Sequence, residues 1–112
     1  MSTVSDGNIA EQAVAEYLAA KAYKIKDLNW KTTFAEIDIV AEKNKTIYFV
    51  EVKYRRTLTA GDGFDYITPK KLMHMQRAAE AWVSSNRWQY GYELMAAAVL
   101  GTEKFDIDIR EI

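Results

Sequence analysis

Hydrophobic residues recur every three or four positions in two stretches of the chain, which is the spacing of a buried helix face. The first stretch runs from Ile9 to Leu18, and we expect its helix to end near Ala22 and Tyr23. The second begins at Thr68-Pro69, because threonine caps helix starts and proline fits the first helical turn. We expect this helix to end between residues 86 and 91, with a buried stripe made of Leu72, Met75, Ala79, Trp82 and Val83.

Segments with alternating or continuous apolar residues predict strands over residues 24–30, 36–42, 46–54, 93–100 and 105–109. Residues 46–54 are apolar nearly throughout, so we expect a central strand that is covered on both faces. In the strand before it, we expect Ile37, Ile39 and Ala41 on one face and Glu36, Asp38 and Val40 on the other. Residues 55–66 contain Gly61 and Gly63 without periodicity, which indicates a loop.

The predicted order of elements is α-β-β-β-α-β-β, which we interpret as an α/β fold with a mixed sheet and a helix on each face. The chain has 112 residues, enough for one domain, and we expect a single domain over residues 1–112. It has no cysteine, so disulfides, thiolate zinc sites and a cysteine nucleophile are excluded. No signal-peptide pattern and no apolar run of roughly 20 residues is found, so we expect a cytoplasmic protein without a membrane partner.

The net charge is −1, which argues mildly against a dedicated nucleic-acid binder. The charge is unevenly distributed, however, because residues 53–77 contain six lysines and arginines but only two aspartates. Lys70, His74 and Arg77 recur at helical spacing, and Arg55 and Arg56 follow the third strand. This stretch is either a phosphate-facing patch or an ordinary solvated surface.

Glu51 and Lys53 are two residues apart in the predicted central strand, so both side chains leave the same face. Charged groups on an apolar strand are costly unless they are paired or bind a ligand. A hairpin with the preceding strand brings Asp38 beside Glu51, and two adjacent carboxylates repel each other unless a cation lies between them. The alternative for all three residues is a cross-strand ladder of salt bridges.

Hard oxygen ligands of this kind suit Mg²⁺ or Mn²⁺. We therefore predict a metal site with Asp38, Glu51 and the backbone carbonyl of Val52 as ligands. Lys53 would orient the attacking water or stabilise charge on a phosphate. Glu11, at the margin of the first helix's apolar stripe, is a candidate additional ligand or else a solvated helix carboxylate.

An ordered set of motifs in this chain resembles the YraN-like family. The motifs are Gly7-x-x-Ala10-Glu11, Asn29, Glu36-Ile37-Asp38, Phe49-Val50-Glu51-Val52-Lys53-x-Arg55 and Thr68-x-Lys70-Lys71, which together span roughly residues 7–83. That family is similar to archaeal Holliday-junction resolvases and belongs to the PD-(D/E)XK nuclease superfamily. The chain departs from the family pattern at Ala35, where glycine is usual, at Lys31, where arginine is usual, and at Glu93-Leu94-Met95.

The resemblance implies a restriction-endonuclease-like core, dependence on Mg²⁺ and a DNA substrate. By position, Asp38, Glu51 and Lys53 are the implied catalytic motif and Glu11 an accessory acid. The basic residues that we expect to contact DNA phosphates are Arg55, Arg56, Lys70, Lys71 and Arg77. A resolvase needs two active sites, so a homodimer is a further expectation. The competing hypothesis is a non-catalytic module of the same fold that binds nucleic acid or a protein partner.

Overall fold

The computed structural model describes residues 6–57 and 63–112. Their elements are α1 (Asp6–Ala20), β1 (Lys24–Lys31), β2 (Glu36–Lys43), β3 (Thr46–Arg55), α2 (Pro69–Asn86), β4 (Gly91–Leu100) and β5 (Asp106–Glu111). The predicted α/β class and the order α-β-β-β-α-β-β are confirmed. Of the loop predicted over residues 55–66, residues 58–62 lie outside the described part of the chain, and Arg55 still belongs to β3.

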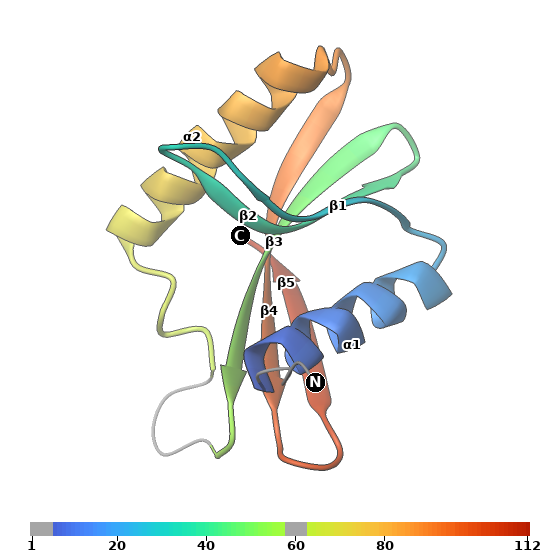
Figure 1. Cartoon of the computed structure of the whole chain (residues 1–112), viewed down its shortest axis with the longest axis vertical. Helices are drawn as coiled ribbons and strands as arrows, with labels where there is room; N and C mark the ends of the chain where they lie inside the picture. The colour runs from blue at the N-terminus through green and yellow to red at the C-terminus, as the bar shows by residue number, and fades with distance from the viewer. Residues whose placement is uncertain (1–5, 58–62) are drawn as a thin grey trace, which may run out of the picture.

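The strands form one mixed sheet in the order β1-β2-β3-β4-β5. All neighbouring pairs are antiparallel except β3 and β4, which are parallel. A parallel pair requires a crossover connection, and α2 is that crossover. Figure 1 shows α1 and α2 on opposite sides of the sheet, as the sequence predicted.

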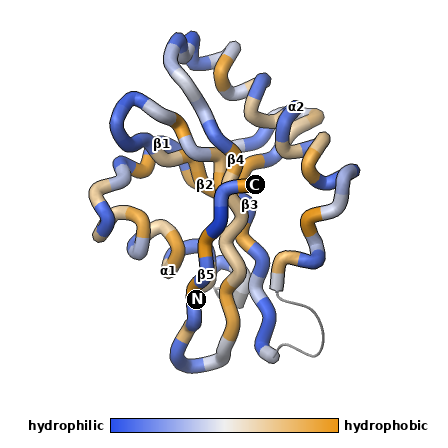
Figure 2. The backbone as a smooth tube through the Cα atoms, turned by 180° about the vertical axis from the view of Figure 1, so that it is seen from behind, coloured by the Kyte–Doolittle hydropathy of each residue, from blue (hydrophilic) through white to orange (hydrophobic). Residues whose placement is uncertain are grey.

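Each face of the sheet carries its own hydrophobic cluster. Residues of α1 pack with Ile39 and Val50 on one face, while Trp82 and its neighbours on α2 pack with Val40 and Phe49 on the other. Figure 2 shows these apolar segments concentrated in the strands and on the inner sides of the helices. Successive residues of β3 enter different clusters, which confirms that this strand is central and covered on both faces.

The start of α2 is held as the sequence predicts. Thr68 is the N-cap, its side-chain oxygen accepts a 3.1 Å hydrogen bond from the amide of Lys71, and Pro69 occupies the first turn. The turn between β2 and β3 has positive φ at both Asn44 and Lys45. Two left-handed residues give a two-residue hairpin the twist that antiparallel strands need.

Some residues expected in the core are partly exposed. Ile9 is 41% exposed, Tyr17 38% and Leu72 37%, because each lies at the edge of its helix's contact with the sheet. Ile37 and Ile39 were expected on one face, but Ile37 packs in the α2 cluster and Ile39 in the α1 cluster. The regular alternation of β2 is therefore broken at Asp38. Neither of the helices in the described part of the chain is long and apolar enough to cross a membrane.

Candidate metal centre and the cleft beside it

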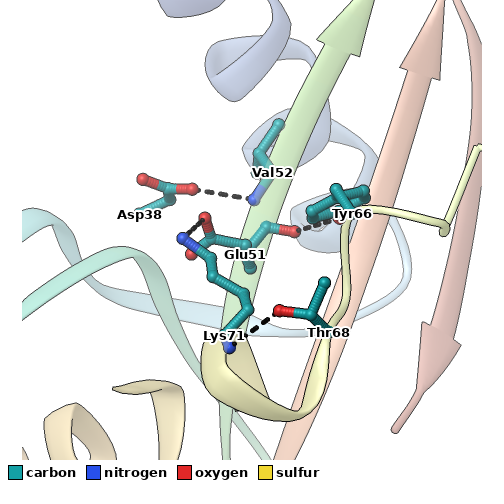
Figure 3. A network of polar contacts seen from close by, with 6 residues as sticks. All are labelled: Asp38, Glu51, Val52, Tyr66, Thr68 and Lys71. Atoms are coloured by element: carbon teal, nitrogen blue, oxygen red, sulfur yellow. Dashed lines mark hydrogen bonds and ion pairs between the residues drawn. The ribbon is translucent and has the colours of Figure 1, made fainter. Parts of the chain in front are cut away.

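The break in β2 coincides with the point where β2 and β3 stop pairing. Their register runs from Lys43↔Thr46 to Ile39↔Val50 and goes no further. One residue beyond, the carboxylate of Asp38 accepts a 2.8 Å hydrogen bond from the amide of Val52 (Figure 3). The side chain thus takes the place of the next backbone partner and satisfies a strand amide that the neighbouring strand no longer reaches.

Burial raises the pKa of Asp38 to about 7, and repulsion by the nearby carboxylate of Glu51 is the next cause. Glu11 and Glu36 add further repulsion, while the hydrogen bond from Val52 acts in the opposite direction. Four carboxyl groups therefore converge here, from α1, β2 and β3. The predicted proximity of Asp38 and Glu51 is found, and the accumulated negative charge is the setting in which a bound cation is most favourable.

Glu11 is brought to this cluster because α1 packs across the sheet. Burial raises its pKa, hydrogen bonds with Asn29 and Asp38 act against that shift, and repulsion by Glu36 and Glu51 adds to it. Asn29 lies within β1 but has a positive φ of 50°. This left-handed conformation is uncommon inside a strand, and asparagine tolerates it better than most residues. Glu11 is therefore part of the acidic cluster and not a remote helix carboxylate.

Glu51 makes its closest polar contact with α2. Its carboxylate lies 2.7 Å from the ammonium of Lys71, and the Thr68 cap that begins α2 holds the backbone of this lysine (Figure 3). The sequence singled out Lys71 only as a phosphate contact. Its pairing with Glu51 depends on the packing of α2 against β3, which no local pattern encodes.

Tyr66 is a neighbour of the site that the sequence did not reveal. Its hydroxyl donates a 3.4 Å hydrogen bond to the backbone carbonyl of Glu51. Burial raises the pKa of Tyr66, and the charges of Glu51 and Asp38 raise it further. It reaches the strand from the segment before α2, so nothing in its sequence neighbourhood marks it.

A cleft of about 700 Å³ opens beside Glu51, between α2 and the turn that joins β1 to β2. Its lining includes Glu36 and Glu51, together with the basic or titratable side chains Lys31, Lys71, His74 and Arg77. We call it the basic cleft. Lys71 and Arg77 are thus the two predicted phosphate contacts that the fold brings to the acidic cluster.

The other predicted site residues lie elsewhere. Lys53 is exposed and lines a second pocket of about 160 Å³, together with Arg55 and the β4–β5 end of the sheet. Arg55 is paired with Asp65 at 2.7 Å. Arg56 and Lys70 are exposed and line neither pocket. The basic residues predicted as one set are therefore divided between two sides of β3.

The departures from the family pattern cause no strain in the described structure. Ala35 is not among the residues with positive φ, so a side chain is tolerated where glycine is usual. Lys31 lines the basic cleft and keeps a positive charge there. Leu94 and Met95 of β4 are buried in the core, on opposite faces of the sheet.

The donor set fits a hard cation that keeps much of its water. Within residues 6–57 and 63–112, no three histidine, aspartate or glutamate side chains form a closed cluster of metal ligands. Mg²⁺ is usually held by one or two carboxylates with waters and substrate oxygens completing its shell, so a closed cage is not required. Asp38 and Glu51 supply two carboxylates. Because N–H and C=O of one strand residue face the same neighbour, the carbonyl of Val52 faces the side of Asp38.

Comparisons with known proteins agree on one family. The model of the uncharacterised protein family UPF0102 matches residues 10–109. A UPF0102 protein of Fusobacterium nucleatum subsp. nucleatum is 38% identical over 104 residues, which cover 92% of this chain and 87% of that protein. One of Cytophaga hutchinsonii is 33% identical over 103 residues, which cover 92% and 91% of the two chains. One of Rhodopseudomonas palustris is 42% identical over 98 residues, which cover 88% and 73%. The chain therefore belongs to the UPF0102 family, which is the YraN family that its motifs resemble.

Proposed function

We propose that this protein is a Mg²⁺- or Mn²⁺-dependent endonuclease that hydrolyses phosphodiester bonds in branched, flapped or single-stranded DNA. The observation that carries the proposal is the acidic cluster of Glu11, Asp38 and Glu51 at the point where β2 and β3 separate. The basic cleft next to this cluster adds support, because it places cations beside the proposed metal ligands.

In this proposal Asp38, Glu51 and the carbonyl of Val52 hold the metal, and Glu11 assists from α1. The metal would supply a water of lowered pKa and a positive charge beside the scissile phosphate. Asp38 is fixed for its role by the amide of Val52, and Glu51 by Lys71. Lys53 leaves β3 on the same face as Glu51 and would stabilise charge on the phosphate.

Contacts to the DNA backbone would come mainly from Lys71 and Arg77 in the basic cleft, with Lys70, Arg55 and Arg56 further out. Lys71 would exchange its ion pair with Glu51 for a phosphate when a metal neutralises that carboxylate. Such contacts position the substrate without reading its sequence. The choice between branched, flapped and single-stranded DNA rests on the family resemblance. We further propose that a second copy of the chain would supply the second active site if the substrate is a junction.

The test is cleavage by the purified full chain of junction, flap, duplex and single-stranded DNA with Mg²⁺ or Mn²⁺. We expect Asp38→Asn and Glu51→Gln each to lower cleavage by about 100-fold or more, because both remove a charged metal ligand. Glu16→Gln is the matched control, since Glu16 is exposed on α1 and distant in sequence from the cluster. Cleavage that survives both substitutions, or that does not need a metal, would contradict the mechanism.

A second candidate is a non-catalytic module that binds nucleic acid or a protein partner. The 2.7 Å ion pair between Lys71 and Glu51 favours it, because the carboxylate is neutralised without any metal. This hypothesis predicts salt-dependent binding to branched DNA in the presence of a chelator, and no metal-dependent cleavage. It also predicts that Asp38→Asn leaves DNA binding and Mn²⁺ uptake unchanged.

A further inference from the structure

An aromatic side chain stands uncovered at the rim of the basic cleft. Phe34, in the turn between β1 and β2, is 97% exposed. The other large hydrophobic residues with substantial exposure range from 37% to 58%. A single exposed hydrophobic residue needs no explanation by itself, so the inference depends on where Phe34 lies and how it is held.

The turn that carries Phe34 is fixed by its own hydrogen bonds. The hydroxyl oxygen of Thr32 accepts hydrogen bonds from the amides of Phe34, at 3.2 Å, and Ala35, at 3.1 Å. The amide of Thr32 in turn donates to the carbonyl of Ala35 at 2.8 Å. These bonds close the end of the β1–β2 hairpin, which reaches out beside α2 in Figure 1. The exposed ring is therefore held on an ordered turn, which lowers the entropic cost of binding through it.

Other exposed aromatic side chains are engaged within the protein. Tyr90 packs edge-to-face on Trp88 with 5.3 Å between ring centroids, and the ammonium of Lys45 lies over its ring. Tyr17 is covered in the same way by Lys21. Among the residues that the structure describes, Phe34 makes no such ring or cation contact. Its face is left for a partner from outside the chain.

The surroundings of Phe34 indicate the chemistry of that partner. Phe34 lines the basic cleft together with Lys31, Lys71 and Arg77, and Glu51 of the acidic cluster lines the same cleft. A partner that carries both negative charge and a flat aromatic surface matches this combination. Single-stranded nucleic acid has both, because basic grooves follow its phosphates while its bases stack on aromatic side chains. In a continuous duplex the bases are stacked on each other and their faces are hidden.

We propose that Phe34 stacks on an unpaired base that flanks the phosphate bound in the basic cleft. The site would then select DNA that has a single-stranded segment, flap or branch over continuous duplex. This inference rests on the proposed nucleic-acid function and adds the residue that determines its substrate class. Phe34 is a binding residue in this scheme and takes no part in the chemical step.

The experiment measures fluorescence anisotropy of labelled single-stranded, flap and continuous duplex DNA in buffer with a chelator, so that binding is separated from cleavage. Base stacking on one aromatic side chain is worth enough that Phe34→Ala is expected to weaken single-strand and flap binding by about tenfold or more. Duplex binding should change little. Phe34→Trp should restore the lost affinity, whereas Phe34→Leu, which keeps an apolar side chain without an aromatic face, should not.

Tyr90→Ala is the matched control, because Tyr90 is an exposed aromatic residue outside the basic cleft and should leave all affinities unchanged. Since Phe34 is almost fully exposed, its variants should melt at the wild-type temperature. Equal binding by wild type and Phe34→Ala, or full rescue by Phe34→Leu, would overturn the role of Phe34 while leaving the proposed nuclease intact. Loss of self-association in Phe34→Ala without loss of DNA affinity would also overturn it. Absence of any DNA binding by the wild type would reject the proposed function itself.

Discussion

The carboxylate of Asp38 accepts a hydrogen bond from the amide of Val52 exactly one residue past the last β2–β3 pair. An acidic side chain on a strand usually points away from the ladder, but this one completes it. The bond fixes Asp38 against the backbone that follows Glu51. It also draws the carboxyl group into a half-buried position where three other carboxylates surround it.

This arrangement predicts that Asp38 destabilises the metal-free protein near neutral pH. Its pKa is raised from 3.8 to about 7 in the folded state, so the folded protein resists ionisation that the unfolded chain undergoes freely. The penalty is absent below about pH 4, grows as the pH rises, and is complete above about pH 7, where it amounts to at most about 4 kcal/mol. We expect Asp38→Asn to be more stable than wild type at about pH 8 by about 1–4 kcal/mol, and by much less at about pH 4.

Urea unfolding in buffer with a chelator measures this difference across the pH range. Asparagine keeps a side-chain oxygen for the amide of Val52, so the substitution removes the charge and little else. Glu16→Gln, on the exposed face of α1, should show no comparable pH-dependent gain. A gain that does not vary with pH would mean that the buried charge is not its source.

The ion pair between Lys71 and Glu51 predicts competition between this lysine and a metal for one carboxylate. We expect Lys71→Gln to raise the affinity for Mn²⁺ by up to about fivefold, because a partly exposed ion pair is worth up to about 1 kcal/mol. Affinity for DNA should fall in the same variant, since a cation is lost from the basic cleft. Calorimetric titration measures the first effect and anisotropy the second.

Lys104→Gln, in the exposed turn between β4 and β5, removes the same charge far from α2 in the sequence and should change neither value. A fall in Mn²⁺ affinity in Lys71→Gln would show that the lysine helps to organise Glu51 and does not compete with the metal.

Gly101 predicts a site of strict backbone demand at the end of β4. It has a φ of 130°, and a side-chain carbon built on it would collide with the backbone carbonyl of Lys104. Its amide also donates to the carbonyl of Arg55, and its own carbonyl accepts a 2.6 Å hydrogen bond from the hydroxyl of Tyr54. We expect Gly101→Ala to lower the free energy of unfolding by about 2 kcal/mol or more.

Gly91→Ala provides the comparison, because a side-chain carbon there meets nothing within 4 Å. Thermal and urea unfolding should place that variant within about 1 kcal/mol of wild type. Equal losses in the two glycine variants would rule out backbone strain as the reason.

Thr68 predicts a link between helix capping and the position of Lys71, because its hydroxyl oxygen accepts the amide of that lysine. We expect Thr68→Ala to cost about 1 kcal/mol of stability, whereas Thr68→Ser, which keeps the hydroxyl, should cost little. Thr68→Ala should also loosen the Lys71–Glu51 contact, which chemical shifts of the Lys71 side chain in NMR spectra would report. An alanine variant as stable as the serine variant would show that the cap is supplied by solvent.

The sequence predicted some levels of this structure well. The strand 46–54 was recognised as central because both of its faces are apolar, and the Thr68-Pro69 start of α2 was recognised from cap chemistry alone. Both signals are local, since they depend on which residues follow one another. The expected alternation of Ile37 and Ile39 was wrong because the strands separate at Asp38, and no local pattern reports where a ladder ends.

By itself, then, the sequence determined the order of the elements, the family, and the acidic residues worth attention. Hydrophobic periodicity and motif spacing are enough for this, because backbone geometry fixes which side chains share a face. Only the tertiary structure decided which groups meet: Glu11 with Asp38, Lys71 with Glu51, and Phe34 with the basic cleft, while Lys53 and Arg55 line another pocket. The physical reason is that these contacts join separate elements, so they depend on how each helix and turn packs against the sheet.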